Sequence, residues 1–380
     1  MTDLPILERV RRRLAVDTSE PSPHSVAAAL RAEHHVAGSA TVLALVDQLR
    51  SETRGAGLLD PLLATPGVTD VLVNGPDEVY IDRGRGLERS AVRFADEESV
   101  RRLAQRLAAQ AGRRLDDASP WVDARLGDGT RLHAVLAPVA WPGTLVSLRV
   151  PARRSFSLDE LRSSGSLTDD IVQLLRRIIA ARAAFVVTGG TGSGKTTLLA
   201  ALLAAVDPNE RLVIVEDATE LRPDHPHVVG LEARPANVEG AGLVTVRDLV
   251  RQALRMRPDR LVVGEVRGAE VVDLLAALNT GHEGGCGTLH ANSPRDVPAR
   301  FEALGVAAGL PRDAVHSQLA ASVDLVIHLA SGRDGVRRVE QIATLERGRD
   351  GAVACVPALT LGHSGAERGP GYPRLETLFR

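Results

Sequence analysis

The sequence predicts an α/β fold, in which a mainly parallel sheet with covering helices follows a small α+β N-terminal domain. Three observations support this prediction. The chain has 380 residues, enough for two domains. Apolar residues make up 44% and charged residues 25% of the chain, a balance typical of globular proteins. From residue 183 onward, short apolar runs alternate with helical patterns, which is typical of parallel strands joined by helices.

The first part of the chain predicts a variable helical leader over residues 1–55 and the small α+β domain over residues 56–150. In this domain the helical spacing of residues such as Leu103 and Leu107 predicts an amphipathic helix over 99–111. Short apolar runs bounded by turn residues predict four strands, at 68–73, 78–82, 131–137 and 144–150.

The second part begins with a predicted linker over residues 151–165, which contains Pro151 and several serines. The larger domain is expected over residues 166–380. Its expected helices include 167–180 and 245–256. Its expected strands are 183–188, 211–216, 260–264, 285–290, 323–329, 336–345 and 352–361.

Composition argues against several classes of protein. The formal net charge of -2 argues against binding nucleic acid through bulk positive charge, so there is no strong nucleic-acid signal. Two cysteines, Cys286 and Cys355, are too few for a disulfide framework or a four-cysteine zinc site. The longest apolar run, Leu198 to Val206, has nine residues, whereas a membrane-spanning helix needs roughly 20. We therefore expect a cytoplasmic protein without a signal peptide or transmembrane segment, which meets a membrane through a partner.

Nearly all basic residues of the chain are arginines. Of its 46 basic residues, 45 are arginine and one is lysine, Lys195. We interpret this as a coding bias that replaced lysine wherever arginine serves as well. A compact ammonium fits inside a phosphate-binding loop, where a planar guanidinium fork does not. The ammonium of Lys195 is therefore expected to have a chemical role.

Lys195 lies in a glycine-rich segment between a predicted buried strand and a helix, the context of a phosphate-binding P-loop. Glycines let successive backbone N–H groups turn toward a β-phosphate, and the helix start adds partial positive charge. Lys195 is expected to reach the β- and γ-phosphates, and the Thr196 hydroxyl to bind Mg²⁺. The residues expected to bind ATP are Gly189, Gly190, Thr191, Gly192, Ser193, Gly194, Lys195, Thr196 and Thr197.

Acidic residues follow two predicted strands, and they help to distinguish an ATPase from a nucleotide kinase. The apolar run 261–264 ends at Glu265, the pattern of a Walker B strand, and ligands lie at the carboxyl ends of parallel strands. We expect Glu265 to hold Mg²⁺, through water; the alternative is a carboxylate that caps a helix. A second strand runs into Glu216, Asp217 and Glu220. One of these could polarise an attacking water as general base, and the alternative is a solvated acidic turn.

Two histidines, His282 and His290, lie near the ends of a third predicted strand. A histidine close to a γ-phosphate can sense it or donate a hydrogen bond to it. Taken alone, each histidine is more often structural, so the sequence leaves both readings open.

The order of these motifs resembles the type II/type IV secretion system ATPase superfamily, the GspE/PilT-like motors, and within it the CpaF/TadA-like branch of tight-adherence pili. Two segments carry the resemblance: residues 246–268, VRDLVRQALRMRPDRLVVGEVRG, and residues 123–134, DARLGDGTRLHA. It covers about residues 56–345. Position 150 departs from it, because the family's usual lysine is replaced by Val150.

The resemblance implies a RecA-like P-loop core and a homo-hexamer at the inner face of the cell membrane. There, hydrolysis of Mg²⁺-bound ATP to ADP and phosphate would drive assembly of a type IV or Tad-type pilus, or protein secretion, with inner-membrane platform proteins as partners. Arginines of the small domain would close over the triphosphate. The implied catalytic residues are Lys195, Glu220, Glu265, His282 and His290, and the implied nucleotide-binding arginines are Arg125, Arg131 and Arg149.

Two other functions stay open. One is a conjugal-transfer or DNA-translocation ATPase with the same core, against which the near-neutral charge and the shortage of aromatic residues weigh. The other is a nucleotide-gated scaffold with little hydrolysis.

Overall fold

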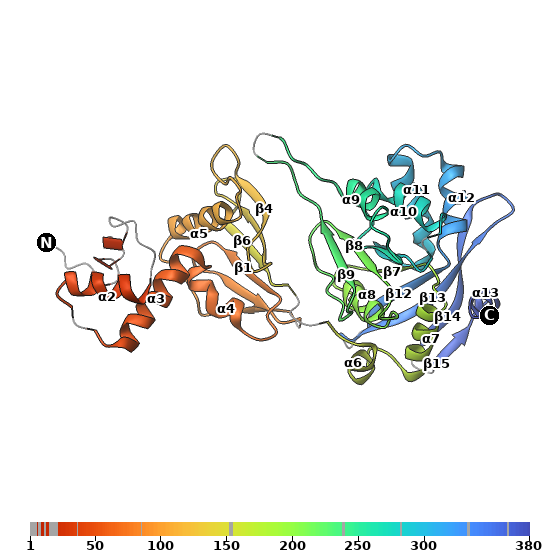
Figure 1. Ribbon diagram of the computed structural model, residues 1–380, viewed down its shortest axis with the longest axis horizontal. Helices are drawn as coiled ribbons and strands as arrows, with labels where there is room; N and C mark the ends of the chain where they lie inside the picture. Colours follow the sequence, from red (N-terminus) through yellow and green to blue (C-terminus); the bar gives the residue numbers. More distant parts are fainter. Residues whose placement is uncertain are drawn as a thin grey trace. The chain divides into compact units, whose positions relative to one another are not determined.

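The computed structural model describes residues 6, 9–10, 13–14, 22–35, 37–84, 86–151, 155–237, 240–281, 283–332, 335–362 and 365–380. The chain divides into two compact units, Met1–Pro151 and Ala152–Arg380 (Figure 1). Both combine helices with sheets, which confirms the predicted α/β class. Within the described ranges, no helix has the length and apolar character needed to cross a membrane.

The first unit begins with α2 (Pro23–Ala32) and α3 (Ser39–Arg54). The Ser22 hydroxyl accepts the Ser25 N–H at 3.1 Å, which caps the start of α2. These helices have a small apolar core of their own, which includes Val26, Leu30, Val46 and Leu49. The short helices η1 (Gly57–Leu59) and α4 (Asp60–Ala64) lead into the sheet.

The sheet of the first unit has six described strands, all paired antiparallel, in the order β3-β2-β1-β6-β5-β4. Its strands are β1 (Asp70–Asn74), β2 (Val79–Asp82), β3 (Leu87–Arg89), β4 (Trp121–Arg125), β5 (Arg131–Val135) and β6 (Leu145–Arg149). Helix α5 (Glu97–Gln110) covers one face, where Leu103 and Leu107 pack with Leu132 and Leu148. The opposite face carries polar and charged side chains, because strand residues alternate between the two faces.

Strands β3 and β4 correct the four strands expected from the sequence. Every residue of β3 is exposed, so it has no apolar alternation to reveal it. Strand β4 buries only Val122 and Ala124, and its outward positions are Trp121, Asp123 and Arg125. Both strands are positioned by backbone hydrogen bonds to a neighbouring strand. A hydrophobic pattern in the sequence does not reveal such bonds.

The second unit is built on a sheet with nine described strands, in the order β15-β14-β13-β12-β7-β11-β10-β8-β9. Strands β12, β7, β11, β10, β8 and β9 are parallel, and β13 to β15 add antiparallel pairs at one edge. The strands are β7 (Phe185–Gly189), β8 (Leu212–Glu216), β9 (Val228–Glu232), β10 (Arg260–Val263), β11 (Cys286–His290), β12 (Leu325–Ser331), β13 (Arg337–Arg347), β14 (Val353–Gly362) and β15 (Gly365–Arg368).

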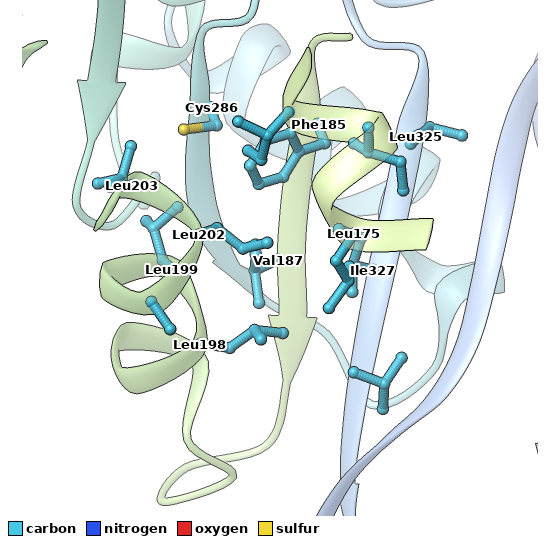
Figure 2. Close-up of a cluster of buried hydrophobic side chains, with 14 of the residues drawn as sticks. Leu175, Phe185, Val187, Leu198, Leu199, Leu202, Leu203, Cys286, Leu325 and Ile327 are labelled. Carbon is cyan, nitrogen blue, oxygen red and sulfur yellow. The ribbon is translucent and has the colours of Figure 1, made fainter. Parts of the chain in front are cut away.

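Helices cover both faces of this sheet. On one face, α7 and α8 pack on β7 and β12, with Leu175, Leu199, Phe185 and Ile327 among the buried side chains (Figure 2). The other face is covered by α9 to α12. The helices are α6 (Leu158–Ser163), α7 (Asp169–Ala180), α8 (Lys195–Ala204), α9 (Val246–Ala253), α10 (Glu270–Leu278), η2 (Pro294–Asp296), α11 (Val297–Ala307), α12 (Arg312–Ser322) and α13 (Tyr372–Thr377).

Three features of this unit correct the sequence prediction. The segment 151–165, expected as a linker, contains α6, which begins with a capping box between Ser157 and Glu160. Of the serines that suggested a linker, Ser157 caps the start of this helix, and Ser163 and Ser164 lie at its end. The edge strands β9 and β15 were not expected, because none of their residues is fully buried. The short final helix α13 was not expected either.

Candidate functional site

The glycine-rich segment after β7 forms a tight loop that ends at the first residue of α8. Gly194 precedes α8 with φ 93°, and Gly192 also has positive φ (72°), conformations that other residues rarely adopt. A Cβ atom on Gly189 would lie 2.5 Å from Ser193 Oγ and 2.6 Å from the Leu329 carbonyl oxygen. Glycine is therefore required at the first position of the loop for steric reasons.

Lys195 turns its ammonium back onto this loop. The side chain is 8% exposed, and Nζ donates to the carbonyl oxygens of Gly189 at 3.0 Å and Gly190 at 2.8 Å. Burial lowers the pKa of Lys195, and the carboxylates of Glu265 and Glu220 oppose that shift. The ammonium thus sits where both acidic groups act on it.

The loop also holds an unpaired buried hydroxyl. Ser193 is 4% exposed, and its Oγ has no hydrogen-bond partner among the described residues. A buried polar group without a partner is costly. A phosphate oxygen is a suitable acceptor for this hydroxyl, together with the N–H groups that the first turn of α8 leaves without helical partners. The residues present therefore fit a nucleotide phosphate.

Glu265 and His290 meet at the carboxyl ends of β10 and β11. Nε2 of His290 lies 3.0 Å from Oε1 of Glu265, and its Nδ1 lies 3.4 Å from Lys195 Nζ. Burial, followed by the charge of Lys195, lowers the pKa of His290, so the ring is neutral at pH 7. Three of the residues predicted from separate motifs thus form one contact chain.

Glu216 differs from the general base considered for the acidic cluster. It is 6% exposed, and its Oε1 accepts the N–H groups of Glu220 and Leu221, each at 3.1 Å. Burial raises its pKa to about 7, although these two hydrogen bonds oppose the rise. Glu216 therefore shapes the turn that carries Glu220.

The same side chain explains the glycine before Glu265. A Cβ atom on Gly264 would lie 2.5 Å from Glu216 Cγ, so only glycine leaves room for the carboxyl. The Gly264 N–H donates to the Val215 carbonyl, and its own carbonyl accepts the Thr288 hydroxyl at 2.6 Å. The two acidic segments are thereby packed directly against each other.

Arg267 is a site residue to which sequence reasoning gave no role. It forms an ion pair with Asp217, and its guanidinium lies 3.8 Å from Glu265 Oε2. It therefore connects both acidic segments. Because the chain is so rich in arginine, nothing in the sequence distinguished this one.

The predicted magnesium ligands are oxygen donors, which is the chemistry that Mg²⁺ prefers. Thr196 is the second residue of α8, in its first turn, and the Glu265 carboxylate is 34% exposed. Among the described residues, no group of three or more acidic, histidine or cysteine side chains could hold a metal by itself. Few protein ligands are usual for Mg²⁺ bound with a nucleotide, so the donor set fits that arrangement. His282 lies outside the described residues.

The three predicted arginines lie in the first unit, in one row across the polar face of its sheet. Arg125 pairs in register with Arg131, and Arg131 with Arg149. Arg131 forms an ion pair with Asp123 at 2.6 Å, and Arg149 with Asp70 at 3.1 Å. Arg131 and Arg149 line an open hollow of about 420 Å³ on this face.

Comparison with known proteins gives a consistent picture. Residues 52–364 match the family described as "Type II/IV secretion system protein". A Mycobacterium tuberculosis protein named "Putative conjugal transfer protein" is 60% identical over 338 residues, which cover 87% of this chain and 94% of that protein. The type IV secretion system protein VirB11 of Brucella suis is 33% identical over 313 residues, covering 74% of this chain and 86% of VirB11.

Solved structures share the fold at low sequence identity, and one of them is a pilus motor. The crystal structure of the pilus retraction motor PilT with bound ADP superposes with a TM-score of 0.51 at 19% identity, covering 82% of each chain. At this identity the likeness concerns the fold.

Proposed function

Since the chain belongs to the type II/IV secretion system protein family, we propose that it is a motor ATPase that hydrolyses ATP to ADP and phosphate. One observation carries the proposal. The ammonium of Lys195, the ring of His290 and the carboxylate of Glu265 form a chain of contacts of 3.4 and 3.0 Å beside the P-loop. A loop that only bound phosphate would not need this acid and this histidine beside its lysine.

Each residue of this cluster has a role in the proposed reaction. Lys195 leaves the carbonyls of Gly189 and Gly190 and pairs with the β- and γ-phosphates. The Thr196 hydroxyl and, through water, Glu265 would hold Mg²⁺, which supplies positive charge to the phosphates when bound. Glu220, whose backbone N–H donates to the Glu216 carboxyl, polarises the attacking water as general base.

The histidines act on the transferred phosphoryl group. His290, whose Nε2 lies 3.0 Å from Glu265 Oε1, would donate from Nε2 to a γ-phosphate oxygen instead of to Glu265 when ATP is bound. We assign His282 the same kind of role, from the sequence resemblance. Both would stabilise charge that develops as the bond to the leaving ADP breaks.

The arginine row of the first unit supplies charge to the triphosphate from outside the P-loop. Arg125, Arg131 and Arg149 would each contribute a guanidinium to the binding of the triphosphate. Arg131 is paired with Asp123 and Arg149 with Asp70. The phosphates would replace these carboxylates as partners of the two guanidinium groups.

In this proposal the second unit is a RecA-like core, and six copies form a ring at the cytoplasmic face of the inner membrane. The ring would drive assembly of a type IV or Tad-type pilus, or protein secretion, through inner-membrane platform proteins. The family match over residues 52–364 supports a role in a secretion or pilus machine.

Steady-state phosphate release by the purified full-length protein tests the proposed reaction. We expect Mg²⁺-dependent turnover that Lys195→Ala removes and Glu220→Gln reduces by at least about 100-fold. Asp224→Asn, on the exposed chain after the same turn, should leave the rate unchanged. Unchanged turnover in Glu220→Gln would overturn the assignment of the general base, and equal rates in the wild type and Lys195→Ala would overturn the ATPase.

Conjugal transfer is a second candidate, favoured by the name of the 60% identical relative. It would make DNA the substrate of the machine that the ATPase serves. Stimulation of phosphate release by single-stranded DNA would support it, and no stimulation at low salt would count against direct DNA translocation.

A further inference from the structure

Glu232 is an exposed residue to which the proposed chemistry gives no role. It is the last residue of β9, and it pairs in register with Glu216, the last residue of the parallel strand β8. The next residue, Ala233, donates its N–H to the Glu216 carbonyl oxygen at 2.9 Å, so the pairing continues beyond Glu232. The backbone of Glu232 is therefore fixed at the carboxyl ends of the parallel strands, where ligands of such sheets bind.

The carboxylate of Glu232 bonds to the turn that follows β8. Its Oε2 accepts the Thr219 hydroxyl at 2.6 Å and the Thr219 N–H at 3.3 Å. Both donors belong to one residue, which lies 13 positions earlier in the chain. Hydrogen bonds to a carboxylate are stronger than those between neutral groups. This contact therefore restrains both the backbone and the side chain of Thr219.

Carboxyl groups from two neighbouring strands hold this turn. The N–H groups of Glu220 and Leu221 donate to Oε1 of Glu216, and the N–H of Thr219 donates to Glu232. Three consecutive backbone N–H groups are thus bonded to side chains, and Glu220 is the middle residue of the three. Glu216 is buried and Glu232 is exposed, so the turn is held from the protein interior and from the solvent side.

We propose that Glu232 is a positioning residue, which holds the turn 217–220 through Thr219 so that the Glu220 carboxylate keeps the orientation that a general base requires. The catalytic consequence rests on the proposed ATPase function, in which Glu220 polarises the attacking water. The restraint of the turn does not depend on that function, so the two are tested separately.

Hydrogen exchange of the full-length, nucleotide-free protein tests the restraint. In Glu232→Ala we expect faster exchange over residues 217–222, because the Thr219 N–H loses its acceptor and the turn opens more often. Glu232→Gln keeps an oxygen that accepts from Thr219 and should keep wild-type exchange there. Thr219→Val removes the hydroxyl alone and should have a smaller effect than Glu232→Ala.

The matched control is a contact of the same kind at the start of α9. The Asp248 carboxylate accepts the Thr245 hydroxyl at 2.6 Å and the Thr245 N–H at 3.0 Å. This contact caps a helix and does not involve the turn after β8. Asp248→Ala should lower thermal stability, because it removes the cap, and should change neither the exchange over 217–222 nor kcat per folded protein.

Phosphate release tests the catalytic consequence. Glu232→Ala should lower kcat about tenfold with little change in KM, because a small displacement of a catalytic group reduces the rate strongly. Glu232→Gln should restore most of the wild-type kcat, since the amide oxygen takes over the bond to Thr219. In a Glu220→Gln background, Glu232→Ala should have little further effect, because it acts through Glu220.

These results separate the failures. Unchanged exchange over 217–222 in Glu232→Ala overturns the restraint. Faster exchange with unchanged kcat, or an equally large loss of kcat in the Glu220→Gln background, overturns the positioning role. If the wild type releases no phosphate, the proposed function fails, and the exchange experiment still decides whether Glu232 holds the turn.

Discussion

Nε2 of His290 lies 3.0 Å from Oε1 of Glu265, and the ring is neutral because burial and Lys195 lower the pKa of His290. The N–H therefore donates to the carboxylate, and the same N–H is available to a phosphate oxygen. We expect His290→Ala to reduce kcat about 100-fold while ADP binding changes little, since ADP lacks the γ-phosphate. Phosphate release and fluorescent-ADP titration measure the two effects. A large loss of ADP affinity with unchanged kcat would contradict this role.

Lys195 should not be replaceable by arginine. The ammonium fits between the carbonyls of Gly189 and Gly190 at 3.0 and 2.8 Å, and a guanidinium is larger and planar. We expect Lys195→Arg and Lys195→Ala to weaken ADP binding alike, about 10- to 100-fold, the value of one or two charged hydrogen bonds. Arg162→Lys, at an exposed ion pair with Asp169, should bind as the wild type does. Normal binding by Lys195→Arg would refute the steric argument.

Glu216 should make the protein less stable as the pH rises. Its pKa is about 7 in the folded protein, against an ordinary 4.5, so the folded state binds the proton more tightly than the unfolded state. The stabilisation by the bound proton is complete below about pH 4.5 and is lost by about pH 7, a change of about 3 kcal/mol. Glu216→Gln keeps an acceptor for the N–H groups of Glu220 and Leu221 and does not titrate.

Urea denaturation followed by circular dichroism measures this difference. The stability of Glu216→Gln relative to the wild type should rise between pH 5 and pH 8. The control is Glu367→Gln, a substitution of the same kind on the exposed strand β15. A variant at Gln341 would not serve, because Gln341 forms a hydrogen bond with Thr360. A constant difference across the pH range would show that Glu216 is not buried as described.

The sequence was sufficient where burial leaves a continuous apolar run. Strands β7, β8 and β10 are buried at every position, so they were predicted within one or two residues, and each is followed by residues of the site. Lys195, Glu265 and His290 could be expected near one another because the carboxyl ends of parallel strands share an edge. The exposed edge strands β3 and β9 leave no such pattern.

What the sequence could not provide is packing between distant residues. Glu216 was one of three possible bases, and only its bonds to Glu220 and Leu221 reveal a supporting role. The role of Arg267 follows from its contacts with Asp217 and Glu265, which lie in two separate segments. These contacts depend on side-chain directions that residue types and spacing do not determine.

Gly264→Ala should disturb both stability and turnover. Its Cβ would lie 2.5 Å from Glu216 Cγ, which must then move and release the turn that carries Glu220. We expect a loss of about 1–3 kcal/mol in the free energy of unfolding, together with a lower kcat. Gly230→Ala, where a Cβ meets nothing within 4 Å, is the control.

A double-mutant cycle identifies the cause. Once Glu216→Ala has removed the obstructing side chain, adding Gly264→Ala should cost almost nothing in stability. If Gly264→Ala costs the same in both backgrounds, the clash is not with Glu216.

Arg260 anchors the opposite end of β10 and should be essential for stability. It is 1% exposed, and its guanidinium donates to both carboxylate oxygens of Glu210, at 2.8 and 3.0 Å, and to the Ile179 carbonyl. Arg260→Met leaves Glu210 partly buried with the weaker pair to Arg182 at 3.5 Å. We expect a loss of about 3–5 kcal/mol, because removing one partner leaves a buried charge poorly compensated.

The double variant Arg260→Met with Glu210→Gln should recover part of this loss, since it removes the unpaired charge as well. Arg176→Met, at an exposed pair with Asp159, should change stability by less than about 1 kcal/mol. Urea denaturation of the four proteins measures these differences. If Arg260→Met is no more destabilising than Arg176→Met, the pair between Arg260 and Glu210 contributes as little to stability as a surface pair.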